Sequence, residues 1–323
     1  CASLLFRFVS DLRRFYCPPL LRRPMRVLVT GATGFVGRRL VPALLEHGHD
    51  VRVLVRDASS YDAPEGVEVF ESDLLEPESL EGVFEGIDVV YYLVHSMRAG
   101  KDFAERDRTA ARNFADAASG MVKRVVYLGG LGETGDELSE HLGSRREVES
   151  VLADGDYALT TLRAAVIIGA GSASFDMVCQ LVEKLPVMTT PRWVRTPCQP
   201  IAIDDAVAYL AGVLDAPETA GETYEIGGSE VLSYEEMMRR TARAMGYEHR
   251  PIVVPVPVLS PGISTYWVDF VTDVPKSIAH PLIHGLKNPV VVTDDSIKEH
   301  VTVESTSFDE AVRRALERTP DSE

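Results

Sequence analysis

Three glycines between a short apolar run and a helical pattern constrain the fold of this chain most. Residues 26–30 read RVLVT, which is typical of a buried strand, and Gly31-Ala-Thr-Gly34-Phe-Val-Gly37 follows directly. The next stretch, RRLVPALLEHG, has apolar residues at helical spacing, and VRVLV at 51–55 predicts a second strand. In a strand–turn–helix–strand unit, this glycine pattern predicts a dinucleotide-binding fold.

Each glycine has a physical role in such a unit. Gly31 permits the tight turn out of the strand, Gly34 lets the backbone approach a pyrophosphate, and Gly37 lets the helix pack closely on the strand. The helix N-terminus offers unpaired N–H groups and the positive end of its dipole to the anion. The intervening residues that we also expect at the cofactor are Thr33, Phe35 and Val36. The alternative is a glycine turn that holds no ligand.

The end of the second predicted strand distinguishes NADP from NAD. A carboxylate there would hold the ribose 2′-hydroxyl and repel a 2′-phosphate, whereas a guanidinium can bind that phosphate with two hydrogen bonds. Arg56 stands at this position and Asp57 follows it. We therefore predict NADP(H) as the cofactor. NAD(H) is the alternative if Asp57 holds the ribose and Arg56 is only a solvated charge.

Strands and helices keep alternating after this unit. Further strands are expected at 67–71, 88–94, 124–128 and 157–162, and helices at about 77–84, 102–118 and 144–153. The alternation predicts an α/β fold, a Rossmann-type doubly wound parallel sheet with a smaller C-terminal substrate region. Ligands bind at the carboxyl ends of such strands. We therefore expect Asp73 and Leu74 near an adenine, and Leu93 to Ser96 beside the cofactor.

The stretches GATGFVG, Asp73-Leu74 and PIAIDDAVAYL resemble the extended and atypical short-chain dehydrogenase/reductases, over roughly residues 25–304. Further stretches are similar to one subgroup of these NAD(P)-binding proteins, described variously as epimerase-like, NmrA-like or similar to the NADPH-binding accessory subunit of respiratory complex I. They are LVHSM (93–97), YLGGLG (127–132), LRAAVIIGAGSASF (162–175), LPVMTTPRWV (185–194) and YWVDFVTDVP (266–275). The resemblance implies a Rossmann core with a smaller C-terminal substrate region.

The chain departs from the catalytic residues of this superfamily. Its members normally use a Ser and a Tyr-x-x-x-Lys motif, whose lysine lowers the pKa of the tyrosine so that it can exchange a proton. The matching window here is His141-Leu-Gly-Ser-Arg145, and Gly129-Gly130 replaces the serine region. The resemblance implies that Arg145 keeps the positive charge and the contact to a cofactor hydroxyl, and that His141 donates the proton. Alternatively, His141 packs at a helix start or faces solvent.

Three further side chains are candidates beside the cofactor. His95 follows the fourth predicted strand, where nicotinamide and substrate should meet, and Ser96 is next to it. We predict a functional contact for His95, against a purely structural histidine. Arg163 ends the sixth predicted strand and could pair with a substrate anion or with a loop carboxylate. The loop 169–174 should be polar and flexible near the substrate cleft, unless it is a plain connection.

We expect three parts along the chain. Residues 1–24 form an arginine-rich extension before a start at Met25, with a transit peptide as the alternative. Residues 25–175 form the NAD(P)-binding core, and residues 176–323 a mixed substrate or cap region that partly returns to the core.

Two features of the C-terminal part carry predictions. Asp204 or Asp205 should cap a helix rather than act as a catalytic pair, and Ser233 with Glu236 reads as a capping box. The proline-rich segment 251–289 suggests a lid or membrane-facing flap over an apolar substrate, such as a quinone or prenyl lipid. A cap over the core or a dimer surface is the alternative.

Composition restricts the partners. The chain has 33 basic and 49 acidic residues and a net charge of −16, with six lysines against 27 arginines. This acidity argues against a nucleic-acid partner and against attachment to anionic lipid by charge. We interpret many acids and few lysines as a halophilic surface, with an ordinary acidic cytosolic protein as the alternative. The four cysteines lack CxxC spacing, so we expect no metal site, and no apolar stretch is long enough for a transmembrane helix.

Two functions remain open from the sequence. The first is an NADP-dependent oxidoreductase or epimerase-like enzyme that acts on a small molecule, either apolar or a nucleotide sugar. The second is an NADP(H)-binding protein without turnover, which serves as a redox sensor or as a structural subunit of a respiratory complex. The missing Ser and Tyr favour the second function. We expect a cytoplasmic protein that joins a membrane only through a partner, and the resemblance implies a homodimer.

Overall fold

The structure is a computed structural model of the chain. It describes residues 24–95, 103–132, 140–185, 187–190, 192–247, 252–255 and 288–318. Within these ranges it does not describe the side chains of 140, 141, 187–190, 192, 193 and 252–255. The predicted extension 1–24, apart from its last residue, therefore lies outside the described residues, as do Ser96 and most of the segment 251–289.

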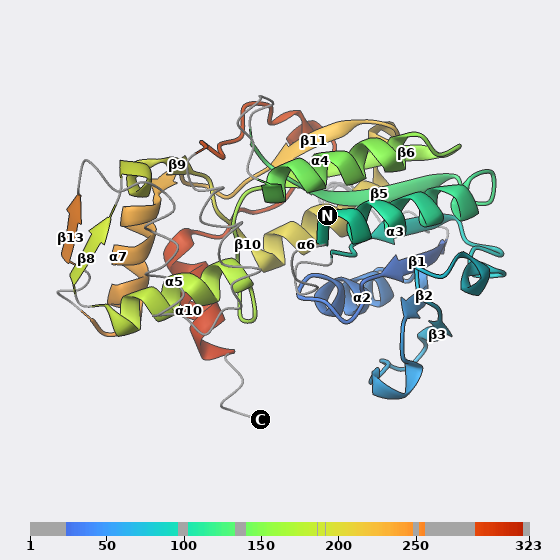
Figure 1. The fold of residues 1–323 in the computed structure, drawn as a ribbon, viewed down its shortest axis with the longest axis horizontal. Coiled ribbons are helices and arrows are strands. Elements are labelled where there is room, and N and C mark those ends of the chain that lie inside the picture. The colour runs from blue at the N-terminus through green and yellow to red at the C-terminus, as the bar shows by residue number, and fades with distance from the viewer. Residues whose placement is uncertain are drawn as a thin grey trace, which may run out of the picture.

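Seven parallel strands form the central sheet (Figure 1), in the spatial order β11-β6-β5-β4-β1-β2-β3. They are β1 (Arg26–Thr30), β2 (Asp50–Val55), β3 (Glu68–Glu71), β4 (Val89–Tyr92), β5 (Arg124–Gly130), β6 (Ala158–Ala164) and β11 (Thr223–Ile226). The order reverses where β4 and β2 flank β1. The predicted Rossmann-type doubly wound parallel sheet is confirmed, and its topological switch point lies at the end of β1.

Both faces of the sheet are buried. Val27 and Val29 of β1 pack into one core with Leu40 and Leu44, whereas Leu28 between them packs into a second core. Successive side chains of a strand point to opposite faces, so a strand that is apolar throughout needs cover on both sides. This is why RVLVT reads as a continuous apolar run rather than an alternating one.

Helices supply this cover (Figure 1). Helices α2 (Gly37–Glu46) and α6 (Ile203–Gly212) lie together on one face, and α3 (Phe103–Ala118) and α4 (Glu140–Ala153) lie together on the other. Helix α6 and strand β11 come from beyond residue 175, yet they complete the core sheet and its cover. The division of the chain near residue 175 stays a prediction.

The C-terminal part builds a third core beside the sheet (Figure 1). Its helices are α5 (Ala173–Lys184), α7 (Tyr234–Ala244) and α10 (Phe308–Glu317), which share the buried cluster that contains Phe175, Met237 and Val312. Three strand pairs flank them: β7 (Ile167–Ile168) with β10 (Ile201–Ala202), β9 (Pro197–Cys198) with β12 (Leu232–Ser233), and β8 (Val187–Thr190) with β13 (Ile252–Pro255). Within the described ranges, none of the helices combines the length and apolarity that a bilayer crossing demands.

Short 3₁₀ turns connect these elements. They are η1 (Ala58–Ser60), η2 (Pro77–Leu80), η4 (Arg192–Arg195), η5 (Val213–Asp215), η6 (Pro217–Thr219) and η7 (Ser296–Glu299). The predicted helix at about 77–84 is therefore wrong: it is limited to η2. Gly82 has φ +76°, a left-handed conformation that ends helical propagation.

The helix starts in the C-terminal part follow two different rules. Ser233 accepts a hydrogen bond from the N–H of Glu236 at 3.1 Å and caps α7, as predicted. The predicted cap of α6 by Asp204 or Asp205 is wrong, because the N-cap is Ala202 and both acids lie in the first helical turn. In the first turn their negative charges still stabilise the helix by interacting with the positive end of its dipole.

Candidate functional site

The glycine turn has no room for side chains at two of its three glycines. Gly31 has φ +71°, which favours glycine, and a Cβ there would lie 2.8 Å from the carbonyl oxygen of Leu93, just beyond β4. A Cβ on Gly37 would lie 2.2 Å from the Gly31 carbonyl oxygen and 2.7 Å from the Cα of Ala32. The turn is therefore packed tightly between β1, α2 and the end of β4.

The start of α2 offers a set of unpaired donors. The backbone N–H groups of Phe35, Val36 and Gly37 have no hydrogen-bond partner among the described residues, and the N-cap Val36 supplies no side-chain cap. Thr33 and Gly34 beside them are exposed. Unpaired N–H groups at the positive end of a helix dipole suit a phosphate group. The residues present therefore fit the diphosphate of a dinucleotide.

Sequence reasoning missed Arg38 in this turn. Arg38 is exposed, and its Nε donates a hydrogen bond to the carbonyl of Gly34 at 3.3 Å, while its two terminal nitrogens have no partner among the described residues. A guanidinium in this position can add charge-assisted hydrogen bonds to a phosphate. The signal was a basic residue directly after the third glycine, in the first helical turn.

The end of β2 presents one unengaged cation and one engaged carboxylate. Arg56 is exposed and has no hydrogen-bond or ion-pair partner within the described ranges. The carboxylate of Asp57 caps η1: it accepts hydrogen bonds from the N–H of Ser59 at 3.0 Å and from its hydroxyl at 2.6 Å. These bonds lower the pKa of Asp57. Another carboxylate, that of Glu71, accepts a hydrogen bond from the N–H of Ala58 at 2.8 Å.

Asp73 and Leu74 follow β3 in a closed turn. Asp73 is half-buried, and its Oδ1 accepts a hydrogen bond from the N–H of Leu75 at 3.0 Å. The side chain of Leu74 is buried in the core below α3, and its carbonyl accepts a hydrogen bond from Asn113 at 2.8 Å. Asp73 can therefore face a nucleotide with its carboxylate, whereas Leu74 can do so only with its backbone.

His95 follows β4 and pairs with a buried carboxylate. Leu93, whose carbonyl contacts Gly31, precedes it by two residues. The Nδ1 of His95 lies 2.5 Å from Oδ2 of Asp107 on α3, and Asp107 is only 2% exposed. Burial is the largest cause that lowers the pKa of His95; the hydrogen bond to Asp107 opposes it, and the charge of Arg145 adds to it. The imidazole therefore favours its neutral form.

Arg145 of α4 reaches the carboxyl end of β5. Its guanidinium donates to the carbonyl of Leu128 and lies over the ring of Tyr127, 5.8 Å from the ring centre. Tyr127 in turn donates its hydroxyl to the Arg145 carbonyl at 3.1 Å. A Cβ on Gly130 would lie 2.9 Å from the Leu142 side chain, so this position closely contacts α4. The structure thus brings Arg145 and His95 to the same edge of the sheet.

His141 and Arg163 are the remaining predicted site residues. His141 lies in the first turn of α4, which begins earlier than predicted, but its side chain lies outside the described part. The guanidinium of Arg163 forms an ion pair with Glu149 of α4. Of the two partners predicted for Arg163, the structure has a carboxylate, although it comes from a helix rather than a loop.

Comparisons with known proteins agree with this geometry. Residues 31–167 match the NAD(P)H-binding family. A ceramide reductase of Caulobacter vibrioides is 29% identical over 243 residues, or 74% of this chain and 75% of the relative. A mitochondrial NADH dehydrogenase [ubiquinone] 1 alpha subcomplex subunit 9 of Arabidopsis thaliana is 25% identical over 83% of this chain and 70% of the relative.

Solved structures share the fold over nearly the whole chain. A nucleoside-diphosphate-sugar epimerase of Staphylococcus aureus superposes with a TM-score of 0.71 at 17% identity, covering 90% of this chain and 100% of that protein. The Bordetella bronchiseptica enzyme WbmG, in complex with NAD, superposes with a TM-score of 0.66 at 19% identity over 93% and 95%. The chain is similar to the atypical short-chain dehydrogenase/reductases. Residues 31–167 therefore form an NAD(P)-binding domain.

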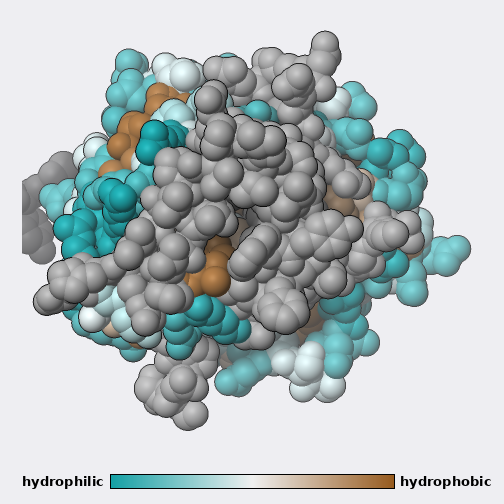
Figure 2. Space-filling view, turned by 60° about the vertical axis from the view of Figure 1, so that its left-hand side comes forward, coloured by the Kyte–Doolittle hydropathy of each residue, from teal (hydrophilic) through white to brown (hydrophobic). Residues whose placement is uncertain are grey.

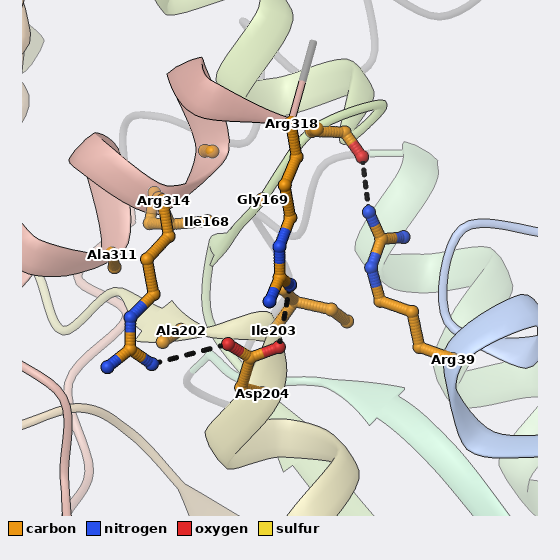
Figure 3. A pocket seen from close by; sticks show the side chains of 11 residues that line it. Arg39, Ile168, Gly169, Ala202, Ile203, Asp204, Ala311, Arg314 and Arg318 are labelled. Carbon is orange, nitrogen blue, oxygen red and sulfur yellow. Dashed lines mark hydrogen bonds and ion pairs between the residues drawn. The ribbon is translucent and has the colours of Figure 1, made fainter. Parts of the chain in front are cut away.

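An arginine-lined pocket lies beside α2, the helix that follows the glycine turn (Figure 3). It is a shallow pocket between α2, α6 and α10. Asp204 lies between Arg314 and Arg318, at 3.4 Å from each. Arg39 donates to the carbonyls of Phe35 and Ala170, both at 2.7 Å. Around this pocket, Asp204 links α6 to the C-terminal helix α10 and its end, and Arg39 links the glycine turn to the loop after β7.

Arg39→Ala should loosen the glycine turn. The substitution removes two hydrogen bonds from a charged donor and the contact of the guanidinium with the Phe35 ring, whose centre lies 4.7 Å away. Because such bonds contribute about 1.5–3 kcal/mol each, partly offset by solvation, we expect a lower melting temperature and about tenfold weaker cofactor binding. Calorimetric titration with NADPH and thermal unfolding measure both.

Two further variants separate the geometry of Arg39 from its charge. Arg39→Lys keeps the charge but cannot reach two carbonyls with one planar fork, so it should resemble Arg39→Ala. Arg112→Ala, an exposed arginine on α3, should change neither quantity. Wild-type affinity in Arg39→Ala would contradict a role in holding the turn.

Proposed function

We propose that this chain is an NADP(H)-dependent oxidoreductase that transfers a hydride to or from a carbonyl or alcohol of an apolar substrate. The observation that carries the proposal is the set of N–H groups of Phe35, Val36 and Gly37, which have no hydrogen-bond partner among the described residues. The His95–Asp107 pair supports it, because His95 follows β4, the neighbour of β1 in the sheet. A bound nicotinamide would supply the hydride chemistry. The protein would orient the substrate and move one proton.

The preference for NADP(H) is supported by the charges at the end of β2. Arg56 has no partner within the described ranges, and the Asp57 carboxylate already accepts two hydrogen bonds from Ser59. The Arg56 guanidinium is therefore available to bind a 2′-phosphate, whereas the Asp57 carboxylate is already engaged by Ser59. Arg38 adds a second cation near the turn.

One relative supports an apolar substrate, whereas several solved structures of similar fold favour a nucleotide sugar. The Caulobacter protein at 29% identity is a ceramide reductase by name, which favours an apolar carbonyl substrate. Structural relatives such as the Thermotoga maritima UDP-glucose 4-epimerase with UDP-glucose favour a nucleotide sugar, but at 16% identity they share the fold only. We therefore place an apolar substrate, such as a ceramide-like ketone or a quinone, ahead of a sugar nucleotide.

NADPH oxidation tests this function. The absorbance of NADPH should fall when the purified protein is mixed with NADPH and long-chain ketones or quinones in detergent. It should not fall with UDP-hexoses. Turnover with UDP-sugars alone would assign an epimerase-like activity instead. The assay should run with and without molar KCl, because the acidic surface predicts better folding in salt.

A second candidate function is a cofactor-binding subunit without turnover. It is favoured by Gly129 and Gly130, where the superfamily's serine region would stand, and by the similarity to the Arabidopsis NADH dehydrogenase subunit. Tight NADPH binding without oxidation by any substrate class, together with co-purification in a large membrane complex, would support it. The homodimer and the cytoplasmic location remain predictions, which gel filtration and fractionation test.

A further inference from the structure

The buried face of α3 carries a single carboxylate. Asp107 is 2% exposed and belongs to the stripe that packs against the sheet. The other buried residues of this helix are Phe103, Ala110, Ala111, Phe114, Ala115 and Ala118. A buried carboxylate costs several kcal/mol unless it is hydrogen-bonded or paired. An apolar residue would serve packing better, so Asp107 calls for another explanation.

His95 is a hydrogen-bonding partner of this carboxylate. The distance from His95 Nδ1 to Asp107 Oδ2 is 2.5 Å, and the ring of Phe103 contacts His95 edge-on, with 6.3 Å between the ring centres. An ionised carboxylate can only accept, so Nδ1–H donates and Nε2 carries the lone pair. The imidazole is thus held in one tautomer and one orientation. Its side chain is 17% exposed, so it is not sealed in the core.

The surrounding charges set the acidity of this pair. Arg145 faces it from α4 and lowers the pKa of His95, whereas Asp107 raises it. Within the described part of the chain, Tyr127 from β5 and Tyr92 from β4 also lie near Asp107, and burial raises the pKa of both phenols, so they stay neutral. The neutral imidazole can accept a proton, and Asp107 stabilises the imidazolium that results.

We propose that Asp107 is the positioning residue for His95 in proton transfer at the cofactor edge, an inference that rests on the oxidoreductase function proposed above. When an alcohol is oxidised, its hydroxyl proton passes to Nε2 of His95, the electron pair of the O–H bond forms the second carbon–oxygen bond, and the hydride of the broken C–H bond would go to the oxidised nicotinamide of the proposed function. In the reverse direction, the imidazolium returns the proton to the carbonyl oxygen. The pair thereby takes the place of the catalytic Tyr-x-x-x-Lys motif, which is missing from this sequence.

The first test needs no cofactor. In ¹⁵N-labelled protein, nuclear magnetic resonance should show His95 as the Nδ1–H tautomer, with its signal assigned by loss in His95→Gln. Asp107→Asn should lower the pKa of His95 by about 1–2 units, because the opposite charge is lost. Asp116→Asn changes an exposed carboxylate on the same helix and should leave His95 unchanged.

The second test uses turnover. Asp107→Asn should reduce kcat about tenfold and shift the pH profile in the direction of the lowered His95 pKa, with little change in the Kd of NADPH. An unchanged pH profile would overturn the positioning role even if the pKa moved, and would leave the oxidoreductase function standing. An Nε2–H tautomer in the wild type would overturn the inference even if Asp107→Asn failed to fold. NADPH binding without any turnover would overturn the proposed function, and the proton-transfer role with it.

Discussion

Gly37→Ala should abolish measurable NAD(P) binding and lower the stability of the fold. A Cβ at this position would lie 2.2 Å from the Gly31 carbonyl oxygen and 2.7 Å from the Ala32 Cα, both backbone atoms that cannot rotate away. The helix must therefore shift from the turn, which displaces the N–H groups of Phe35 and Val36 that have no partner in the described ranges. Forced overpacking of this kind costs about 1–3 kcal/mol.

The loss of affinity should exceed the loss of stability. Hydrogen bonds to a charged group contribute about 1.5–3 kcal/mol each, so misplacing two donors predicts at least about 100-fold weaker binding. Calorimetric titration with NADPH measures the affinity, and thermal unfolding measures the stability. Wild-type affinity in a folded Gly37→Ala variant would show that the diphosphate does not lie at the start of α2.

Gly143→Ala is the matched control. Gly143 lies inside α4, and a Cβ there would meet nothing within 4 Å. Alanine should therefore stabilise this helix by about 0.5–1 kcal/mol, because it has less backbone freedom to lose. Cofactor affinity should not change. The pair of variants separates the close approach at Gly37 from the general effect of adding a methyl group.

The nucleotide half of the site could be predicted because its signals are local in sequence. The strand, the glycine spacing and the helix that follow one another over residues 26–46 fix the turn by sterics alone. Gly31 and Gly37 have the tight contacts that their predicted roles require. Alternating apolar segments likewise predicted the parallel sheet, since both of its faces need helical cover.

The catalytic half was less accessible, because its contacts join distant segments. The pairing of Arg163 with Glu149 depends on how α4 lies on β6, which no local pattern states. Asp107 did leave a signal: with Phe103, Ala110 and Phe114 it falls on the apolar stripe of α3. A charged residue on such a stripe indicates a buried partner. The predicted caps at Asp204 and Asp205 are wrong because α6 already begins at Ile203, whose side chain packs into the core.

Arg56→Ala should weaken NADPH binding by about 10–100-fold and leave NADH binding nearly unchanged. Only NADPH has a 2′-phosphate, and a charge-assisted pair of hydrogen bonds to it contributes about 1.5–3 kcal/mol. Because Arg56 is exposed, rising salt should screen this interaction and reduce the preference of the wild type for NADPH. Fluorescence titration with both nucleotides, at low and at molar KCl, measures these changes. Arg239→Ala, an exposed arginine on α7, should alter neither affinity.

Asp57→Ala decides between the two cofactor assignments. If Arg56 reads a 2′-phosphate, losing the Asp57 carboxylate should only destabilise η1, because that carboxylate caps the turn through Ser59. NADPH affinity should then stay the same or rise slightly, as a negative charge near the phosphate is removed. If Asp57 instead holds the ribose hydroxyl, the variant should lose NADH affinity by tenfold or more while Arg56→Ala has no effect, and NAD(H) would be the cofactor. The two cofactor assignments therefore predict opposite effects of these variants. The ratio of the dissociation constants for NADPH and NADH distinguishes the assignments without knowledge of the substrate.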